Sequence, residues 1–203
     1  MNEISDHASL RAHMGAISAV AERKVLPRLD RHCRAFIGLS PFLVLATADS
    51  AGRVDASPRG DPPGFVQVLD DSTLLLPDRP GNNRVDSFAN ILTASGVGLI
   101  FFVPGIDETL RVNGTARLLT EAEPLAALEV NGRMPKTGLV IEIDEAFFHC
   151  AKALRRAKLW DPAVQVERAS FPSLGRILTE QTSGLSVAEA EQRIETAYRE
   201  KMY

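Results

Sequence analysis

The sequence is poor in cysteine and tryptophan: Cys33 and Cys150 are the only cysteines among 203 residues, and Trp160 is the single tryptophan. A chain of this length can bury enough surface to fold without a disulfide or a structural metal. We therefore expect the cysteines to be core residues or bystanders, although a bridge between them stays open at this point. No secretory signal is visible in the sequence, which favours a reducing compartment.

The sequence also lacks an excess of basic residues and a long hydrophobic run. It has 23 Lys and Arg against 26 Asp and Glu, a formal net charge of −3. Proteins that neutralise a nucleic-acid backbone usually carry a basic excess, so we expect no nucleic-acid partner. The longest apolar stretch, 96–106, is broken by Pro104 and Gly105 and is far shorter than the roughly 20 residues that cross a bilayer. We expect a cytoplasmic protein with no membrane partner.

What the sequence does contain is the composition of one ordinary globular domain, with 45% hydrophobic and 24% charged residues. Residues 5–38 show helical spacing, and Ser5 or Asp6 can cap the first turn. Pro27 interrupts the pattern and predicts two helices joined there. The apolar positions that carry this spacing are Leu10, Met14, Ile17 and Val20.

From position 41 the pattern changes to short apolar runs separated by turn signals, which predicts about seven antiparallel strands. Helices are expected at 84–92, at 121–130 and in the tail 173–203, where Ser186 and Glu189 form a possible capping box. This pattern is typical of a small antiparallel barrel or sandwich with flanking helices. The expected strands are 42–47, 53–57, 65–69, 73–76, 96–103, 109–119 and 138–148.

The loop after the strand that ends at Leu76 is a candidate anion site. The stretch Pro77-Asp-Arg-Pro-Gly-Asn-Asn-Arg84 leads into a helix that we expect to open at Asn83 or Arg84. The first turn of a helix has unpaired N–H groups, and these stabilise a phosphate. Arg79 and Arg84 flank this position. The alternative is an ordinary helix start, capped by Asn83, with two solvated arginines.

A second polar cluster, Ser57-Pro-Arg-Gly-Asp61, follows an adjacent predicted strand and is stiffened by prolines. Polar residues at the end of an apolar strand are typical of a shaped ligand edge. Arg59 and Arg84 could then hold two ends of one anionic, planar molecule.

This order of segments resembles the split-barrel flavin-binding proteins related to pyridoxamine 5′-phosphate oxidase. The resemblance covers roughly residues 40–162 and is strongest to the FMN-dependent branch of that family. Its fold is mainly β with flanking helices, an antiparallel split β-barrel of the FMN-binding type. We accordingly expect a single domain over 1–203, with helices in 1–39, the barrel in 40–162 and helices in 173–203. The segments that carry the resemblance are SPRGD, PDRPGNNR, GVGLIFF, LRVNGTARL and FFHCAKALRRAKLW.

The resemblance implies a homodimer with FMN at the subunit interface. It implies that 82–84 hold the phosphate and that 57–61 line the ring. Thr109 and Arg111 would approach the cofactor from the far side. Oxidases of the family have a basic pair where this chain has Asn82-Asn83, so the phosphate here would depend on Arg79, Arg84 and backbone N–H groups. The partner subunit would supply Lys158 and Trp160. The implied cofactor residues are Ser57, Arg59, Gly60, Asp61, Pro77, Asp78, Arg79, Asn82, Asn83, Arg84, Thr109, Arg111, Lys158 and Trp160.

The resemblance further implies an FMN-dependent oxidoreductase that acts on an unidentified small molecule, with a nicotinamide nucleotide as a candidate reductant. The flavin carries the redox chemistry, so no side chain is assigned a catalytic role. The C-terminal basic motif of the vitamin B6 oxidases is not recognisable, which disfavours that substrate. The alternatives are a non-catalytic flavin-, haem- or deazaflavin-binding module on the same barrel, or an interaction domain without a cofactor.

Three smaller features carry expectations of their own. The pairs His32-Cys33 and His149-Cys150 are adjacent in sequence, and neighbours on a strand point to opposite faces, so no metal site is expected. Asn113-Gly114 is a hairpin signal, whereas the family runs one long strand through it. We follow the family, with Gly114 permitting a bulge or a close backbone approach. Trp160 is equally compatible with the core and with an interface.

Overall fold

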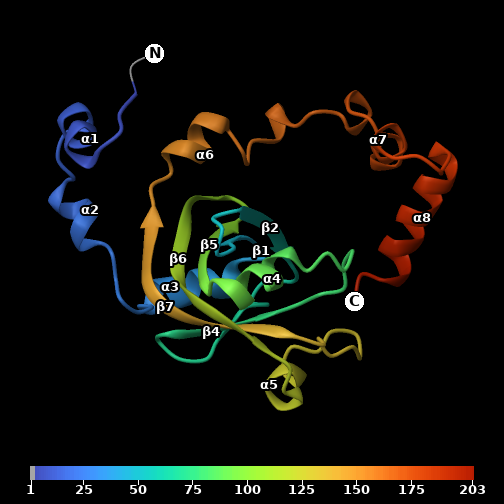
Figure 1. Cartoon of the computed structure of the whole chain (residues 1–203), viewed down its shortest axis with the longest axis horizontal. Coiled ribbons are helices and arrows are strands. Elements are labelled where there is room, and N and C mark those ends of the chain that lie inside the picture. The colour runs from blue at the N-terminus through green and yellow to red at the C-terminus, as the bar shows by residue number, and fades with distance from the viewer. Residues whose placement is uncertain (1–2) are drawn as a thin grey trace.

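A computed structural model describes residues 3–203, and a seven-stranded antiparallel sheet forms its centre (Figure 1). The strand order is β2-β1-β5-β6-β7-β4-β3. Within the described residues β2 and β3 are the two edges and do not pair, so the sheet is not closed into a full barrel. The antiparallel sheet with flanking helices confirms the predicted fold class. The strands are β1 Phe42–Ala48, β2 Val54–Gly60, β3 Gln67–Val68, β4 Thr73–Pro77, β5 Gly96–Val103, β6 Ile106–Leu119 and β7 Gly138–His149.

The core follows from alternation along the central strands. On β5 every second residue is buried, and Leu43 and Leu45 of β1 are fully enclosed. Apolar area removed from water in this way is the main stabilising term of the fold. Helix α3 (Arg31–Leu39) adds Cys33, Phe36 and Ile37 to this cluster.

Strand β6 runs without interruption through Asn113-Gly114, as expected from the family resemblance rather than from the hairpin signal. The pairing of β6 with β7 shifts register at this point. A Cβ atom on Gly114 would overlap the backbone carbonyl oxygen of Glu142. Glycine is therefore required here by the close approach of two backbones.

The prediction of two N-terminal helices joined at Pro27 was wrong, because three helices occupy this region. They are α1 His7–Met14, α2 Ala19–Arg23 and α3. Gly15 has φ of 79°, and its N–H closes the end of α1 on the Arg11 carbonyl. A glycine in this left-handed region is a common helix stop. The predicted Asp6 cap is confirmed, since its carboxylate accepts the Ser9 N–H at 2.9 Å.

The C-terminal part of the chain is a series of short helices and turns. After β7 come α6 Lys152–Ala157, two short 3-10 turns (Pro162–Val164 and Arg168–Ser170), α7 Leu174–Gln181 and α8 Val187–Glu200. Gly184, with φ of 106°, lies between α7 and α8. The capping box at the start of α8 is confirmed: Ser186 and Glu189 exchange both hydrogen bonds.

Two smaller helices and the cysteines complete the description. Helix α4 spans Asp86–Thr93 and α5 spans Ala122–Ala126. None of the helices in residues 3–203 is long and apolar enough to cross a membrane. Both cysteines are free. Burial raises the pKa of the Cys33 thiol to about 11, so this thiol stays protonated as a core residue.

Candidate functional site

The structure brings the two polar clusters of the sequence together around one cavity of about 480 Å³. One wall is β2 and the other is the loop from β4 into the first turn of α4. Residues more than 15 positions apart in the chain thus face the same space. The lining residues are Asp55, Ser57, Pro58, Arg59, Gly60, Phe65 and every residue from Pro77 to Phe88.

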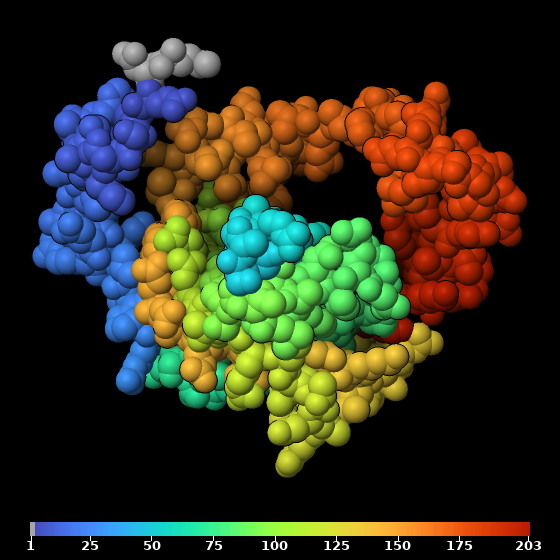
Figure 2. Space-filling model, in the orientation of Figure 1, coloured from blue at the N-terminus to red at the C-terminus, as the bar shows by residue number. Residues whose placement is uncertain are grey.

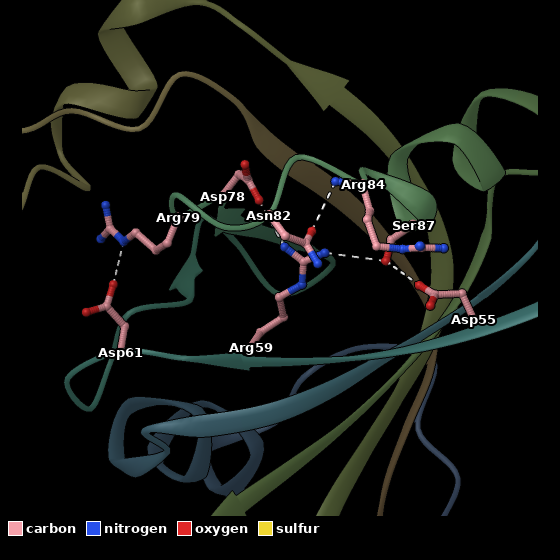
Figure 3. Close-up of polar contacts among 8 residues, drawn as sticks. All are labelled: Asp55, Arg59, Asp61, Asp78, Arg79, Asn82, Arg84 and Ser87. Atoms are coloured by element: carbon pink, nitrogen blue, oxygen red, sulfur yellow. Dashed lines mark hydrogen bonds and ion pairs between the residues drawn. The ribbon is translucent and has the colours of Figure 1, made fainter. Parts of the chain in front are cut away.

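Arg59 lines this cavity, and Figure 3 shows it between Asp78 and Ser87. Its guanidinium donates to the Asp78 carboxylate at 2.9 Å and to the Ser87 hydroxyl at 3.4 Å, and it lies over the Phe88 ring. Its Nε is buried and has no hydrogen-bond partner among the described residues. Burial raises the pKa of Asp78, although Arg59 acts in the opposite direction. The position of Arg59 is therefore fixed while one donor remains unused.

Arg79 is directed away from Arg59 and Arg84, as Figure 3 shows. Its Nε donates to Asp61 at 2.5 Å, and the Asp61 side chain is only 1% exposed. The second oxygen of Asp61 accepts the Tyr203 hydroxyl at 2.9 Å, and the Arg79 guanidinium lies over the Tyr203 ring. Arg79 and Asp61 thus form a closed contact with the C-terminal residue, and Asp61 does not line the cavity.

The first turn of α4 differs from the sequence prediction. The helix begins at Asp86, so neither Asn83 nor Arg84 opens it, and its N-cap position is Val85. Asn83 and Val85 both have positive φ, 58° and 52°. Asn82 accepts the Arg84 N–H at 3.0 Å, which holds the loop in a tight turn. Tertiary contacts of this loop overrode the local capping signal.

Asn83, the predicted cap, does not cap α4 in the structure. The Asp86 carboxylate in the first turn accepts from the Arg84 Nε at 2.8 Å. Among the described residues, no side chain caps α4. Its first N–H groups therefore remain available at the cavity wall, as the anion-site hypothesis requires. Left-handed Val85 is strained, since a β-branched residue rarely adopts this conformation, and such strain is typical of functional loops.

Sequence reasoning missed several cavity residues. The Ser87 hydroxyl donates to Asp55 at 2.6 Å and links β2 to α4. Asp55 shares a face of β2 with Ser57 and Arg59 because strand residues two apart point the same way. This alternation could have identified Asp55 from the sequence. The sequence carries no comparable signal for Val85 and Phe88, because the loop geometry determines where they lie.

Besides Asp61, four predicted cofactor residues of the described chain lie outside the cavity. Thr109 is buried in β6, and Arg111 donates to Glu145 at 3.1 Å and lies over the Phe147 ring. Lys158 ends α6 in a left-handed conformation. The Trp160 indole N–H donates to the Ile106 carbonyl at 2.9 Å. The assignment of Lys158 and Trp160 to a partner's site stays a prediction.

Arg111 belongs to a second cationic cluster on the outer face of β6 and β7. The Lys24 ammonium donates to the Phe148 carbonyl at 2.7 Å and lies over the Phe147 ring. The His149 ring is beside Phe147. Burial lowers the pKa of His149, and the positive charges of Arg111 and Lys24 lower it further. In residues 3–203 no group of three or more histidine, cysteine or acidic side chains is arranged to hold a metal.

Comparison with known proteins places this arrangement in a family. The model of the pyridoxamine 5′-phosphate oxidase family matches residues 29–150, which contain the whole sheet and the cavity. The chain belongs to the pyridoxamine 5′-phosphate oxidase family. This confirms the resemblance drawn from the SPRGD and PDRPGNNR segments. The matched region leaves α1, α2 and everything beyond position 150 outside the family model.

Three solved structures each align with somewhat more than half of this chain. HupZ of Group A Streptococcus is 21% identical over 59% of this chain and 93% of its own, with a TM-score of 0.48. A putative pyridoxamine 5′-phosphate oxidase of Lactobacillus delbrueckii is 23% identical over 60% and 95%, with 0.47. An FMN-binding protein of Syntrophomonas wolfei is 16% identical over 58% and 83%, with 0.46. The comparison with curated proteins gives no match.

Proposed function

We propose that the protein is an FMN-dependent oxidoreductase for a small molecule, with FMN held in the cavity between β2 and loop 77–88. The observation that carries this proposal is the convergence of Arg59, Arg84 and the uncapped start of α4 on one space. Phosphate and planar heteroaromatic groups are recognised by guanidinium donors and free backbone N–H groups.

The cavity fits such a cofactor in size and in donors. Its volume of about 480 Å³ is within the 300–1,000 Å³ that is usual for cofactor sites. Arg59 has a buried Nε with no partner among the described residues, which a ligand acceptor would satisfy. The lining residues of the described chain include none of the histidine, cysteine, methionine or tyrosine side chains that ligate haem iron. The donor set therefore favours a phosphorylated flavin over haem.

The carboxylates of the site indicate which arginine holds the phosphate. Arg84 and Asp86 are both largely exposed, and exposed pairs contribute little free energy. A phosphate can therefore replace Asp86 at the Arg84 guanidinium at small cost. The Arg59–Asp78 pair is more buried. Arg59 would therefore stay paired with Asp78 and donate a hydrogen bond from its Nε to the flavin.

The bound flavin would supply hydride or electron transfer, and the side chains would set its position and environment. The Arg59 guanidinium would place positive charge beside the cofactor, and this charge would stabilise the negative charge that develops on reduction. Phe88 and Phe65 provide apolar surface on the cavity wall. This reaction needs no acidic or basic side chain of the cavity to transfer a proton.

A second copy of the chain completes the site in this proposal. Lys158 and Trp160 are outside the cavity of their own copy, and a homodimer would bring the partner's pair to it. The indole of Trp160 offers an aromatic face, and Lys158 offers a charge.

The test begins with the absorbance spectrum of the purified protein and titration of the apoprotein with FMN, a deazaflavin and haem. We expect flavin bands and saturable FMN uptake at one site per chain. A colourless protein that takes up no FMN contradicts the proposal. Anaerobic stopped-flow mixing with NADH and NADPH then separates an oxidoreductase from a carrier, because only the former is reduced at a useful rate.

A further inference from the structure

The segment from Leu159 to Glu200, here named the arch, stands away from the sheet (Figure 1). It leaves the barrel after α6 and returns at the C-terminus, where Arg133 donates to the carbonyl oxygens of Glu200 and Tyr203. Figure 2 shows an opening between the arch, in orange and red, and the barrel beneath it. The arch is thus fixed at its two ends and spans open space between them.

The accessible surface of the chain is much larger than its mass requires. It is 13559 Å² for 22.1 kDa, whereas a compact monomer of that mass exposes about 9,300 Å². The difference is about 4,200 Å² by the same relation. Obligate homodimers bury about 1,000–2,500 Å² on each copy. The extra surface is therefore sufficient for a large, permanent interface.

The surface in question is rich in exposed apolar side chains. Phe171 is 64% exposed and Val166 is 79% exposed, both in the arch. A groove of about 190 Å³ between α7 and α8 is lined mainly by Leu178, Leu185 and Ile194. Several strongly exposed apolar side chains in one segment are typical of an interaction surface.

The N-terminal helices α1 and α2 also lie in a region with exposed apolar side chains. In the described chain neither α1 nor α2 contains a buried residue, and Met14, Ile17 and Val20 are each more than half exposed. Isolated helices of this length are marginal in water, and they become stable when an apolar face is covered. Both ends of the chain therefore present helices that still need a covering surface.

We propose that the arch, together with α1 and α2, is a clasp that closes on a second copy of this chain. A two-fold dimer makes the same contact twice, so each arch receives the barrel of the other copy and both open spaces are filled. Edge strand β2 forms part of the surface below the arch, and its Val54 is 85% exposed. The clasp shares the homodimer with the proposed function, but it does not depend on FMN.

A pair of charges in the arch tests this proposal in the full-length protein. Val166→Glu/Phe171→Glu places two carboxylates where the clasp would bury them, which should raise the dimer dissociation constant about a hundredfold or more. Sedimentation velocity and light scattering over a dilution series measure this change. Leu69→Glu is the matched control, because Leu69 is 50% exposed in the turn between β3 and β4. That variant should remain a dimer.

Hydrogen exchange on the wild-type protein gives a second readout that does not depend on a variant folding. Amides of α7 and α8 should exchange more slowly above the dimer dissociation constant than below it. A monomeric wild-type protein, a double variant that dimerises like wild type, or equal exchange at both concentrations overturns the clasp. A dimer that binds flavin but does not bury the arch would contradict the clasp and leave the proposed function intact. Failure of the clasp and failure of the proposed function are therefore distinguishable.

Discussion

At the scale of single residues, three arginines near one cavity differ in how firmly a carboxylate holds them. Arg79 is paired with an Asp61 side chain that is 1% exposed, whereas the Arg84 side chain is 72% exposed. Desolvation strengthens an ion pair and makes its separation costly, while solvent screens an exposed pair. Arg79 is therefore a fixed structural contact with Asp61 and Tyr203, and Arg84 can exchange its partner for a ligand.

Replacing Arg84 tests this distinction. Arg84→Ala should weaken FMN binding by about 1.5–3 kcal/mol, because a charge-assisted phosphate contact is lost. The free energy of unfolding should hardly change, since the pair with Asp86 is exposed. Calorimetric titration and urea unfolding measure the two effects. Arg176→Ala is the control, because it removes an equally exposed arginine paired with Glu180 in α7. Unaltered FMN affinity in Arg84→Ala would move the phosphate elsewhere.

Gly114 offers a second residue-scale prediction. A methyl group at this position meets the Glu142 backbone, which cannot move without disturbing the β6–β7 ladder. Gly114→Ala should lower the free energy of unfolding by about 1–3 kcal/mol or more. Gly96→Ala should be close to neutral, because nothing lies within 4 Å of its Cβ position. Equal unfolding midpoints for the two variants would contradict the close approach.

At the scale of elements, the strands were predictable and the loop at the site was not. Turn signals and alternation identified all seven strands because each is specified by local spacing and one buried face. Strand β3 is shorter than the predicted 65–69, since only Gln67 and Val68 pair with β4. The sequence also predicted that 57–61 and 77–84 lie close together, and both segments line one cavity, except that Asp61 does not reach it.

The start of α4 could not be predicted because its geometry depends on distant partners. The Ser87 hydroxyl contacts Asp55 and Arg59, which are about thirty positions earlier in the chain. Those contacts fix where the helix begins, and the preceding residues adopt left-handed conformations to reach it. Local capping preferences are worth about 1 kcal/mol and lose to such tertiary constraints.

The strain at Val85 leads to an element-scale prediction. Asparagine tolerates a left-handed backbone far better than valine does, and the left-handed form costs about 1–2 kcal/mol for an ordinary residue. Val85→Asn should therefore raise the free energy of unfolding by about 1 kcal/mol, as measured by urea denaturation. Val54→Asn changes an exposed valine in the β2 strand and should give no gain. A lower midpoint for Val85→Asn would show that the loop is not strained.

At the scale of the whole molecule, the family model and the sheet cover the middle of the chain. Most of the flanking helices lie outside both. Residues 42–149 contain every strand and most of the core. Periodicity indicated helical segments before and after the strands, although not the number of N-terminal helices. It does not say what an apolar face covers. A face that has no partner within its own chain is visible only when the chain is folded and its total surface is compared with its mass.

Global stability should also depend on pH through His149. Because its pKa is lowered in the folded protein by burial, Arg111 and Lys24, the unfolded chain binds a proton more readily. The free energy of unfolding must then fall as the pH drops below the ordinary histidine value of about 6.5. Carboxylates protonate mainly below this window, so they contribute little to the slope there.

The measurement is urea unfolding at a series of pH values between about 5.5 and 7.5. His149→Gln stays neutral throughout and should show a flatter dependence than wild type. His13→Gln, on exposed α1, should retain the wild-type slope because His13 is outside the β6–β7 cluster. If His149→Gln and wild type lose stability in parallel, neither burial nor the charges of Arg111 and Lys24 lower the pKa of His149 in the folded protein. The cationic cluster on β6 and β7 would then be electrostatically independent of global folding.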